Sequence, residues 1–380
     1  QVGSTGYCRR CNVSIRCQYL LLILAVASLF AVTACVESSE PREIPVGSIP
    51  HPTATPSRIT FPVDELDHET RLEWWYHNGH LESESGREFG FHFVVFKADD
   101  GLNEPNFVSQ LGILDVETGT HYELARAEVG MRQIDGGPMT IGIADWVYGL
   151  LSVKGGHFFD ARSGDIGLSL DLEAVTPVML HNEIGWLPTE LGSTYYYSWP
   201  RQEAVGELTI DGETVQVTGT GWFDHQWGDF FVLGKPAGWQ WFAVQLDNGG
   251  SLMITESRGI NGEIIDTYGT FMSGDGSVRD LRSEDDGIDL TALGEWTSPE
   301  SDATYPSGWA LTIDSLSMDL TINPVAKDQE VQTGLPSAST YWEGKASASG
   351  RHNGIPIAGH AYVELSGYVE PEPVEWMQRR

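Results

Sequence analysis

Two short stretches of this chain combine ionisable side chains with tryptophans. Residues 72–81 contain Glu73, and residues 219–229 contain Asp224 and His225. Carboxyl and imidazole groups can transfer protons in a reaction, and indole faces stabilise cations. These residue types could protonate an alkene, tolerate the carbocation that forms and activate a water molecule to add to it.

Both stretches are predicted to be β-strands, in which alternate side chains share a face. In the second strand, His225 shares a face with Trp227, whereas Asp224 shares the opposite face with Trp222. Asp224 and His225 therefore point apart and do not form a ready-made catalytic pair. Glycines at 219, 221 and 228 are typical of a strand that bends or that another backbone approaches closely.

In the first strand, Glu73, Trp75 and His77 are expected on one face, opposite Trp74 and Tyr76. Aromatic strands commonly form barrel core, so a structural role for these residues is one interpretation. Two such strands, each mixing an ionisable group with indoles, favour a functional site instead.

Several motifs resemble the AttH/carotenoid 1,2-hydratase family of lipocalin-like proteins. They are Glu73-Trp-Trp-Tyr76, Gly79-His80-Leu81, Trp222-Phe-Asp-His-Gln-Trp-Gly228, Tyr195-Tyr-Tyr-Ser198, Trp239-Gln-Trp-Phe242, Tyr305-Pro-Ser-Gly-Trp309, Tyr341-Trp-Glu-Gly344 and Tyr362-Val-Glu-Leu-Ser-Gly-Tyr368. The resemblance covers roughly residues 60 to 370. It implies an all-β fold of two tandem lipocalin-like (calycin-type) antiparallel β-barrels. It also implies catalytic roles for the His and Trp of the Asp-His-x-Trp-Gly motif, here His225 and Trp227.

The expected site is a lipophilic cavity between the first and last strands of the N-terminal barrel. Its catalytic residues are expected to be Glu73, Asp224, His225 and Trp227. The side chains expected to line it for ligand binding are Trp74, Trp75, Tyr76, Phe91, Phe93, Tyr196 and Trp222.

The rest of the chain also reads as β-structure. Phenylalanines alternate at 89, 91 and 93, and no segment has a long apolar period of 3.6 residues, so barrels or sandwiches are favoured. A weak internal repeat, in which residues 75–86 parallel 241–250, supports two copies of one architecture. We expect an N-terminal domain at 59–232 and a C-terminal domain at 233–372.

The N-terminal region predicts export and lipidation. Arg9, Arg10 and Arg16 precede an apolar run, and residues 32–35 end in Cys35 and resemble a bacterial lipobox. We expect a lipoprotein signal peptide at 1–34, a lipidated Cys35 and a Pro/Ser-rich tether at 35–58. The protein would be held on a membrane in the bacterial cell envelope, outside the cytoplasm. An uncleaved anchor or an ordinary signal peptide is the alternative.

Charge and motifs argue against other classes of partner. Lys and Arg total 22 against 54 Asp and Glu, a formal charge of −32, which repels nucleic acid. No nucleotide-binding motif occurs, and His77 and His80 would face opposite sides of a strand. We therefore expect no cofactor and no metal site.

Three functions are compatible with the sequence. The first is hydratase-type lyase chemistry on a hydrophobic unsaturated molecule, carotenoid- or terpenoid-like, as the resemblance implies. The second is a lipoprotein that binds a lipophilic ligand without turnover. The third and weakest is a secreted hydrolase, because the chain has no Gly-x-Ser-x-Gly nucleophile elbow.

Overall fold

The computed structural model describes residues 56–99, 101, 103–130, 132–133, 139–189, 192–230, 238–259, 261–332 and 340–369. The predicted signal peptide, Cys35 and most of the predicted tether lie outside these residues. Strands make up 67% of the structure and helices 5%, and the strands pair antiparallel, so the predicted all-β class is confirmed. No helix in the described part of the chain is long and apolar enough to cross a bilayer.

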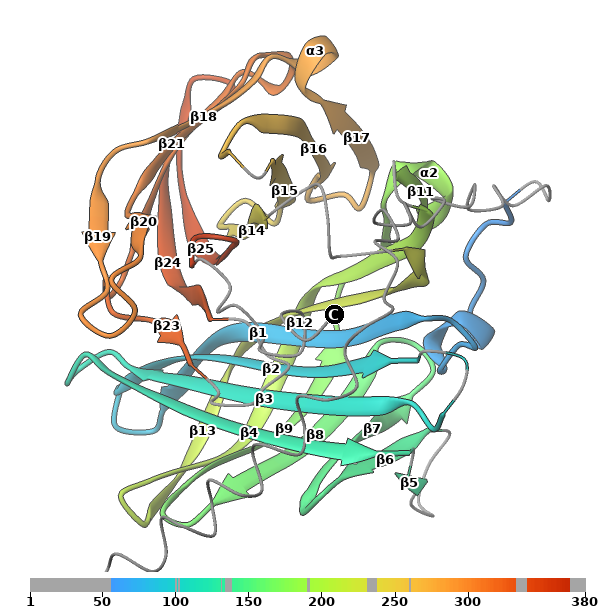
Figure 1. Ribbon diagram of the computed structural model, residues 1–380. Coiled ribbons are helices and arrows are strands. Elements are labelled where there is room, and N and C mark those ends of the chain that lie inside the picture. Colours follow the sequence, from blue (N-terminus) through green and yellow to red (C-terminus); the bar gives the residue numbers. More distant parts are fainter. Residues whose placement is uncertain are drawn as a thin grey trace, which may run out of the picture. The chain divides into compact units, whose positions relative to one another are not determined.

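The first sheet contains the strands β1 (Leu72–Ser83), β2 (Glu88–Ala98), β3 (Asn106–Asp115), β4 (Thr120–Val129), β5 (Arg132–Gln133), β6 (Thr140–Ile143), β7 (Trp146–Ser152), β8 (Gly156–Ser163), β9 (Ile166–Ala174), β10 (Met179–Leu180), β11 (Trp186–Thr189), β12 (Gly192–Ile210) and β13 (Glu213–Phe230). Their order is β4-β3-β2-β1-β13-β12-β9-β8-β7-β6-β5, with β10 and β11 paired to β12. Since β3 and β4 at one edge contact β6 near the other, the sheet curls into a nearly closed barrel (Figure 1).

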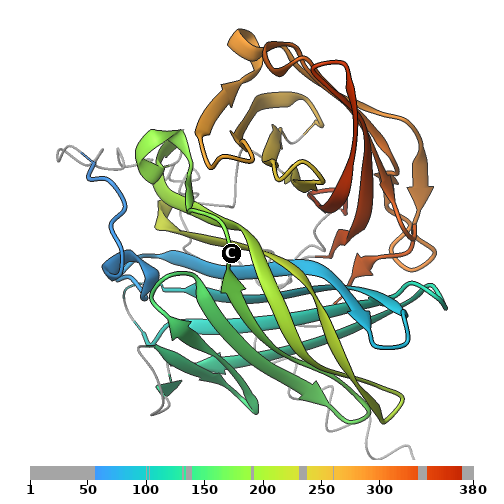
Figure 2. The same cartoon turned by 180° about the vertical axis from the view of Figure 1, so that it is seen from behind.

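The second sheet contains the strands β14 (Gly238–Leu246), β15 (Ser251–Arg258), β16 (Ile264–Met272), β17 (Val278–Arg282), β18 (Ile288–Ala292), β21 (Trp309–Ile313), β22 (Met318–Pro324), β23 (Glu330–Val331), β24 (Tyr341–His352) and β25 (Ile355–Ser366). Their order is β17-β16-β15-β14-β25-β24-β22-β21-β18, with β23 paired to β24. This sheet forms the second barrel, which Figure 2 shows from behind. The chain changes sheet between Phe230 and Gly238, beside the predicted boundary at 232/233.

The remaining elements are short. They are the pair β19 (Glu295–Thr297) and β20 (Thr304–Pro306), the helical turns α2 (Asn182–Gly185) and α3 (Ser283–Asp286), and the 3-10 turns η1 (Val63–Glu65) and η2 (Asp314–Leu316). The α3 turn contacts both β17 and β18 and so joins the two edges of the second sheet.

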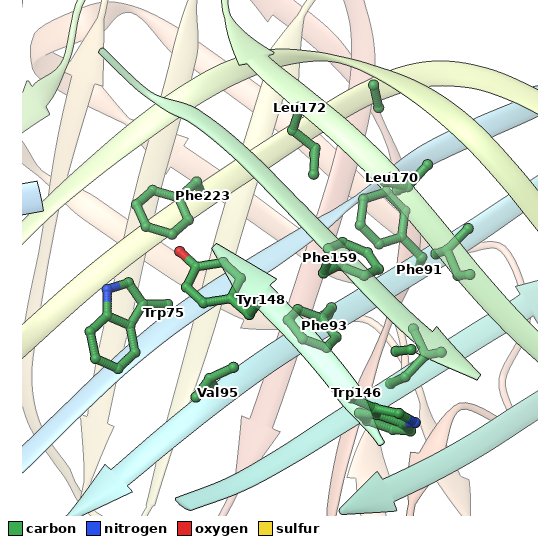
Figure 3. Packing of buried hydrophobic residues seen from close by; sticks show 14 of the residues in the cluster. Trp75, Phe91, Phe93, Val95, Trp146, Tyr148, Phe159, Leu170, Leu172 and Phe223 are labelled. Atoms are coloured by element: carbon green, nitrogen blue, oxygen red, sulfur yellow. The ribbon is translucent and has the colours of Figure 1, made fainter. Parts of the chain in front are cut away.

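Each barrel has its own apolar core. In the first, Phe89, Phe91 and Phe93 of β2 all point inward, as their alternation predicts, and Phe93 stacks on Phe159 at 4.2 Å (Figure 3). A third cluster contains residues from both sheets, among them Tyr76, Trp222 and Trp241. Residues 73–81 of β1 and 221–228 of β13 are therefore covered on both faces, which explains why aromatic side chains in these segments point to both sides.

Gly219 of β13 is required because the backbone of β1 approaches it closely. A Cβ atom on Gly219 would lie 1.9 Å from the backbone oxygen of His80 on β1. The predicted close approach of another backbone is thus observed at this position.

Candidate active site

Strands β1 and β13 bring the two chemically suggestive stretches together. They are antiparallel neighbours, with Trp75 opposite His225 and Tyr76 opposite Asp224. Alternation divides the side chains between two environments. Glu73 and His225 point into the first barrel, whereas Asp224 and Tyr76 point toward side chains of the second sheet.

On the inward face, Glu73 is surrounded by hydrogen-bond donors. Its Oε1 accepts hydrogen bonds from His225 Nε2 at 2.9 Å and His68 Nδ1 at 2.7 Å. Its Oε2 accepts from the His68 backbone N–H at 3.0 Å and from Lys97 Nζ at 3.1 Å. Burial alone would raise the pKa of Glu73, but the hydrogen bonds from His225 and His68 outweigh it and lower the pKa to about 2. Glu73 is therefore ionised and cannot donate a proton at neutral pH.

His225 has both ring nitrogens engaged. Nε2 donates to Glu73, and Nδ1 accepts from the Tyr197 hydroxyl at 3.1 Å. Burial lowers the pKa of His225, so the ring is neutral. The Trp75 and Trp227 rings lie 5.1 and 4.6 Å from it. This arrangement suits a buried polar network that holds β1 and β13 in register.

The predicted lining residues of the inward face belong to packed core. Phe91 and Phe93 contact Phe159, and Trp75 lies near Tyr148 (Figure 3). Trp227 stacks on His68 at 3.9 Å.

Three side chains of this network could hold a metal ion, because ligand atoms of His68, Glu73 and His225 lie within 4.8 Å of one another. In the structure, however, the Glu73 carboxylate is already paired with the Lys97 ammonium group. His77 and His80 point into different surroundings, as the strand pattern predicts: His77 lies beside His157 in the first barrel, and His80 beside His360 of the second sheet.

On the outward face, Asp224 lies among aromatic side chains. It accepts hydrogen bonds from Tyr196 Oη at 2.5 Å, Ser198 Oγ at 2.5 Å and Trp222 Nε1 at 2.7 Å. Asp224 is only 4% exposed. Burial raises the pKa of Asp224 to about 7, although the three hydrogen bonds oppose the rise. Near neutral pH a large fraction of this carboxyl group keeps its proton.

The second sheet supplies the opposite wall. One cross-strand row of this sheet contains Glu343 of β24, Glu364 of β25, Trp241 of β14 and Tyr268 of β16. The Tyr76 hydroxyl is hydrogen-bonded to Glu343.

Further contacts join Trp241 to the first sheet. Its Nε1 donates to Tyr196 Oη at 3.1 Å, and its ring lies 5.5 Å from Tyr76 and 6.2 Å from Trp222. We call this set the seam cluster: Tyr76, Tyr196, Trp222, Asp224, Trp241, Glu343 and Glu364.

One edge of the seam cluster is partly exposed to solvent. Glu364 is half-buried, and Trp239 Nε1 donates to its Oε1 at 3.0 Å. Burial raises the pKa of Glu364 to about 7. The Trp74 and Tyr268 rings are also half-buried. A hydrophobic molecule could therefore approach the carboxyl groups between aromatic rings.

A separate polar groove of about 440 Å³ lies further along β1. His80, the β1–β2 hairpin, β13, Lys345 and His360 line it, and Asp224 does not.

The residues predicted to share one cavity are thus distributed over two sides of the β1–β13 ribbon. Glu73 and His225 are hydrogen-bonded to each other, whereas Asp224 faces away from them. The residues on the inward side are Glu73, Trp75, Phe91, Phe93, His225 and Trp227, and those on the outward side are Trp74, Tyr76, Tyr196, Trp222 and Asp224.

Several residues of both environments were missed from the sequence. Nothing in the sequence singles out His68 or Lys97, because a loop and a neighbouring strand deliver them. Tyr197 could have been found, since it follows Tyr196 and must point to the opposite face of β12. Glu364 was not missed, because the internal repeat places it at the position of Asp224 and marks it, with Glu343, as a second-rank catalytic candidate.

We expect Glu73 to stabilise the fold above about pH 4.5. Its folded-state pKa lies below the ordinary value, so its contribution is lost as the pH falls from 4.5 towards 2. Over this range the free energy of unfolding of the wild type should fall by roughly 3 kcal/mol more than that of Glu73→Gln. At neutral pH the variant should be less stable by about 3–5 kcal/mol, because Lys97 loses its partner. Urea unfolding at several pH values measures both effects, and parallel pH curves would contradict the assignment.

The contribution of Asp224 to the free energy of unfolding should depend on pH in the opposite direction. Its folded-state pKa is raised from 3.8 to about 7, so the folded state binds a proton that the unfolded state releases. Stability contributed by this group is therefore lost as the pH rises from 3.8 to about 7, by up to roughly 4 kcal/mol. Asp224→Asn should lack this loss in the same urea titration. Equal losses in wild type and variant would show that Asp224 is ionised in the folded protein.

Two solved structures are similar in fold to this chain. A crystal structure assigned to AttH from Nitrosomonas europaea has 27% sequence identity and a TM-score of 0.75, over 84% of this chain and 99% of that chain. Kievitone hydratase from Nectria haematococca has 17% identity and a TM-score of 0.65, over 81% of this chain and 93% of that chain. The second likeness concerns the fold alone. A search of curated proteins gave no match.

The sequence model of the AttH-like family matches residues 52–368, which include both barrels and every residue of the seam cluster. The chain therefore belongs to the AttH-like family.

Proposed function

We propose that this protein is a hydratase-type lyase that acts on a hydrophobic, unsaturated, carotenoid- or terpenoid-like small molecule at the seam cluster. The observation that carries the proposal is the Asp224 carboxyl group, whose pKa of about 7 lets it keep a proton among indole and phenol rings. Hydration of an alkene requires such an acid near neutral pH.

The seam cluster has a group for each step of the reaction. Asp224 gives its proton to one alkene carbon and becomes a carboxylate. The faces of Tyr76, Trp222 and Trp241 stabilise the cation on the other carbon. Water adds to that carbon and loses a proton to a base, for which half-buried Glu364 is suited because a pKa of about 7 leaves a large fraction of it ionised near neutral pH. The product is an alcohol.

The inward network is less suited to this chemistry. Glu73 is ionised, His225 is neutral with both nitrogens engaged, and the surrounding rings are packed core. In this proposal His225 and Trp227 act by holding β13 in place beside β1. The name of kievitone hydratase, which shares the fold, supports a hydration reaction on such a scaffold.

Binding without turnover is the alternative, and one observation favours it. Asp224 already has three hydrogen-bond partners, a pattern that a structural carboxyl group also shows. A hydrolase has weaker support. Ser198 does contact His181 at 2.9 Å, but its hydroxyl is fully buried and also bonded to Asp224.

Incubation with a panel of isoprenoid alkenes in water carrying heavy oxygen tests the proposal. The wild type should convert an alkene to a product heavier by one labelled water, detected by mass spectrometry. Asp224→Asn should lower the rate by about 10²–10⁴-fold. Asp229→Asn, an exposed aspartate on the same strand, should leave it unchanged. A ligand that is retained but never altered in mass would instead establish the binding function.

We further propose that Cys35 carries a lipid anchor in a bacterial envelope membrane, on the sequence pattern alone. Full-length protein expressed in a bacterial host should partition into the membrane fraction, and Cys35→Ser should move it out of that fraction or leave the leader uncleaved. Mass spectrometry of the mature N-terminus provides the direct check. A processed N-terminus at another residue would refute the lipidation of Cys35.

A further inference from the structure

Asp224 is the start of a continuous series of hydrogen bonds that the chemistry above does not use. Its Oδ1 is 2.5 Å from Ser198 Oγ, which is 2.9 Å from His181 Nε2. His181 Nδ1 is 2.8 Å from Thr270 Oγ1, which is 3.2 Å from Asp280 Oδ1. The series therefore leads from the buried acid of the first sheet to a carboxylate on β17 of the second.

The interior members of the series are shielded from water, whereas its far end is not. Ser198, His181 and Thr270 are each 0% exposed, and Asp224 is 4% exposed. Asp280 is half-buried. Each interior member can both donate and accept a hydrogen bond: two through hydroxyl groups and one through the two nitrogens of imidazole. Such a series can pass a proton without bringing water to Asp224.

The positions of these residues are fixed by the fold. Asp224 and Ser198 are register partners on β13 and β12, and Thr270 and Asp280 are register partners on β16 and β17. The His181 ring lies 3.9 Å from the Tyr196 ring, between the two pairs. Asp280 also accepts a hydrogen bond from the backbone N–H of Asn182 at 2.8 Å, which ties the outer end of the series to the His181 segment.

The proposed hydration creates a need for such a path. Each turnover leaves Asp224 as a carboxylate, while the proton from the added water is released from the base to solvent. Asp224 must regain a proton before the next turnover, and the aromatic rings and the substrate separate it from solvent.

We propose that Ser198, His181, Thr270 and Asp280 form a proton relay that reprotonates Asp224 from solvent. This inference rests on the proposed function. The Thr270 hydroxyl donates to Asp280 in the structure, and it turns to His181 Nδ1 when Asp280 takes up a proton. The Asp280 proton then moves to the Thr270 oxygen, and the Thr270 hydroxyl proton moves to His181 Nδ1. The proton of His181 Nε2 moves to Ser198 Oγ, and the Ser198 hydroxyl proton moves to Asp224.

The transfer is concerted, so one proton enters at Asp280, one arrives at Asp224 and no charge stays on the relay. Burial lowers the pKa of His181 to about 3, which disfavours an imidazolium intermediate and agrees with a concerted transfer. The imidazole ends in its other tautomer, and rotation of the hydroxyl groups and of the ring restores the starting pattern.

Thr270→Val tests the relay with little change in shape, because it replaces one hydroxyl group by a methyl group. The first turnover uses a proton already on Asp224 and should keep the wild-type rate. Later turnovers should slow by at least about tenfold, so product should appear as a burst of at most one per active site, equal to the fraction of Asp224 that starts protonated. Thr270→Ser restores the hydroxyl group and should restore the steady rate. Thr267→Val, which alters another buried threonine of β16, should behave as wild type.

The experiment distinguishes failure of the relay from failure of the proposed function. An equal slowing of the first and later turnovers in Thr270→Val would show that Thr270 only maintains the site, and an unchanged steady rate would show that Asp224 is reprotonated by another path. Either result overturns the relay. A wild type that hydrates no alkene overturns the proposed function instead.

A measurement that does not depend on turnover then tests whether the relay reprotonates Asp224. After a rapid drop in pH, the infrared band of the protonated Asp224 carboxyl group, identified by its loss in Asp224→Asn, should rise more slowly in Thr270→Val than in wild type. Equal rise times would refute the relay.

Discussion

Burial of both faces of one antiparallel ribbon is the constraint on which the rest of this structure depends. Strands β1 and β13 form part of the wall of the first barrel, and their outer side chains also pack against the second sheet. Buried polar groups of the central ribbon have little access to bulk water. Partners within the protein are therefore favoured, which explains the long hydrogen-bonded networks around Glu73 and Asp224. Trp75 Nε1 and both ring nitrogens of His77 are exceptions, buried without a hydrogen-bond partner among the described residues.

The same ribbon places two carboxyl groups in opposite protonation states. Glu73 accepts four hydrogen bonds, one from a lysine, and remains charged; Asp224 accepts three from neutral groups and retains a proton. Burial raises the pKa of both carboxyls, so the hydrogen bonds that Glu73 receives from His225 and His68 make the difference. Separation of pKa values between neighbouring carboxyl groups is how a protein obtains an acid and a stable anion near neutral pH.

Much of the fold could be read from the sequence, because its signals are local. Alternating phenylalanines on β2 predict an inward face, and the parity of β13 correctly places Asp224 and His225 on opposite sides. The site could be predicted only in part. Aromatic residues on both faces of the ribbon do not reveal that two different sheets cover those faces, so inward and outward aromatic residues were assigned to one cavity. His68, Lys97 and His181 come from loops or neighbouring strands, and no spacing rule connects them to their partners.

The strict alternation of faces along β13 also limits how proteins built on this ribbon can diversify. Inserting one residue between Trp222 and Asp224, or deleting Phe223, would turn each following side chain to the opposite face. An imidazole would then enter the seam and a carboxyl group the packed barrel, where Tyr197 and His68 are arranged for other partners. Such proteins can therefore accept point substitutions on one face of this strand but not changes in its length. The two environments can evolve separately only if the register of β13 stays fixed.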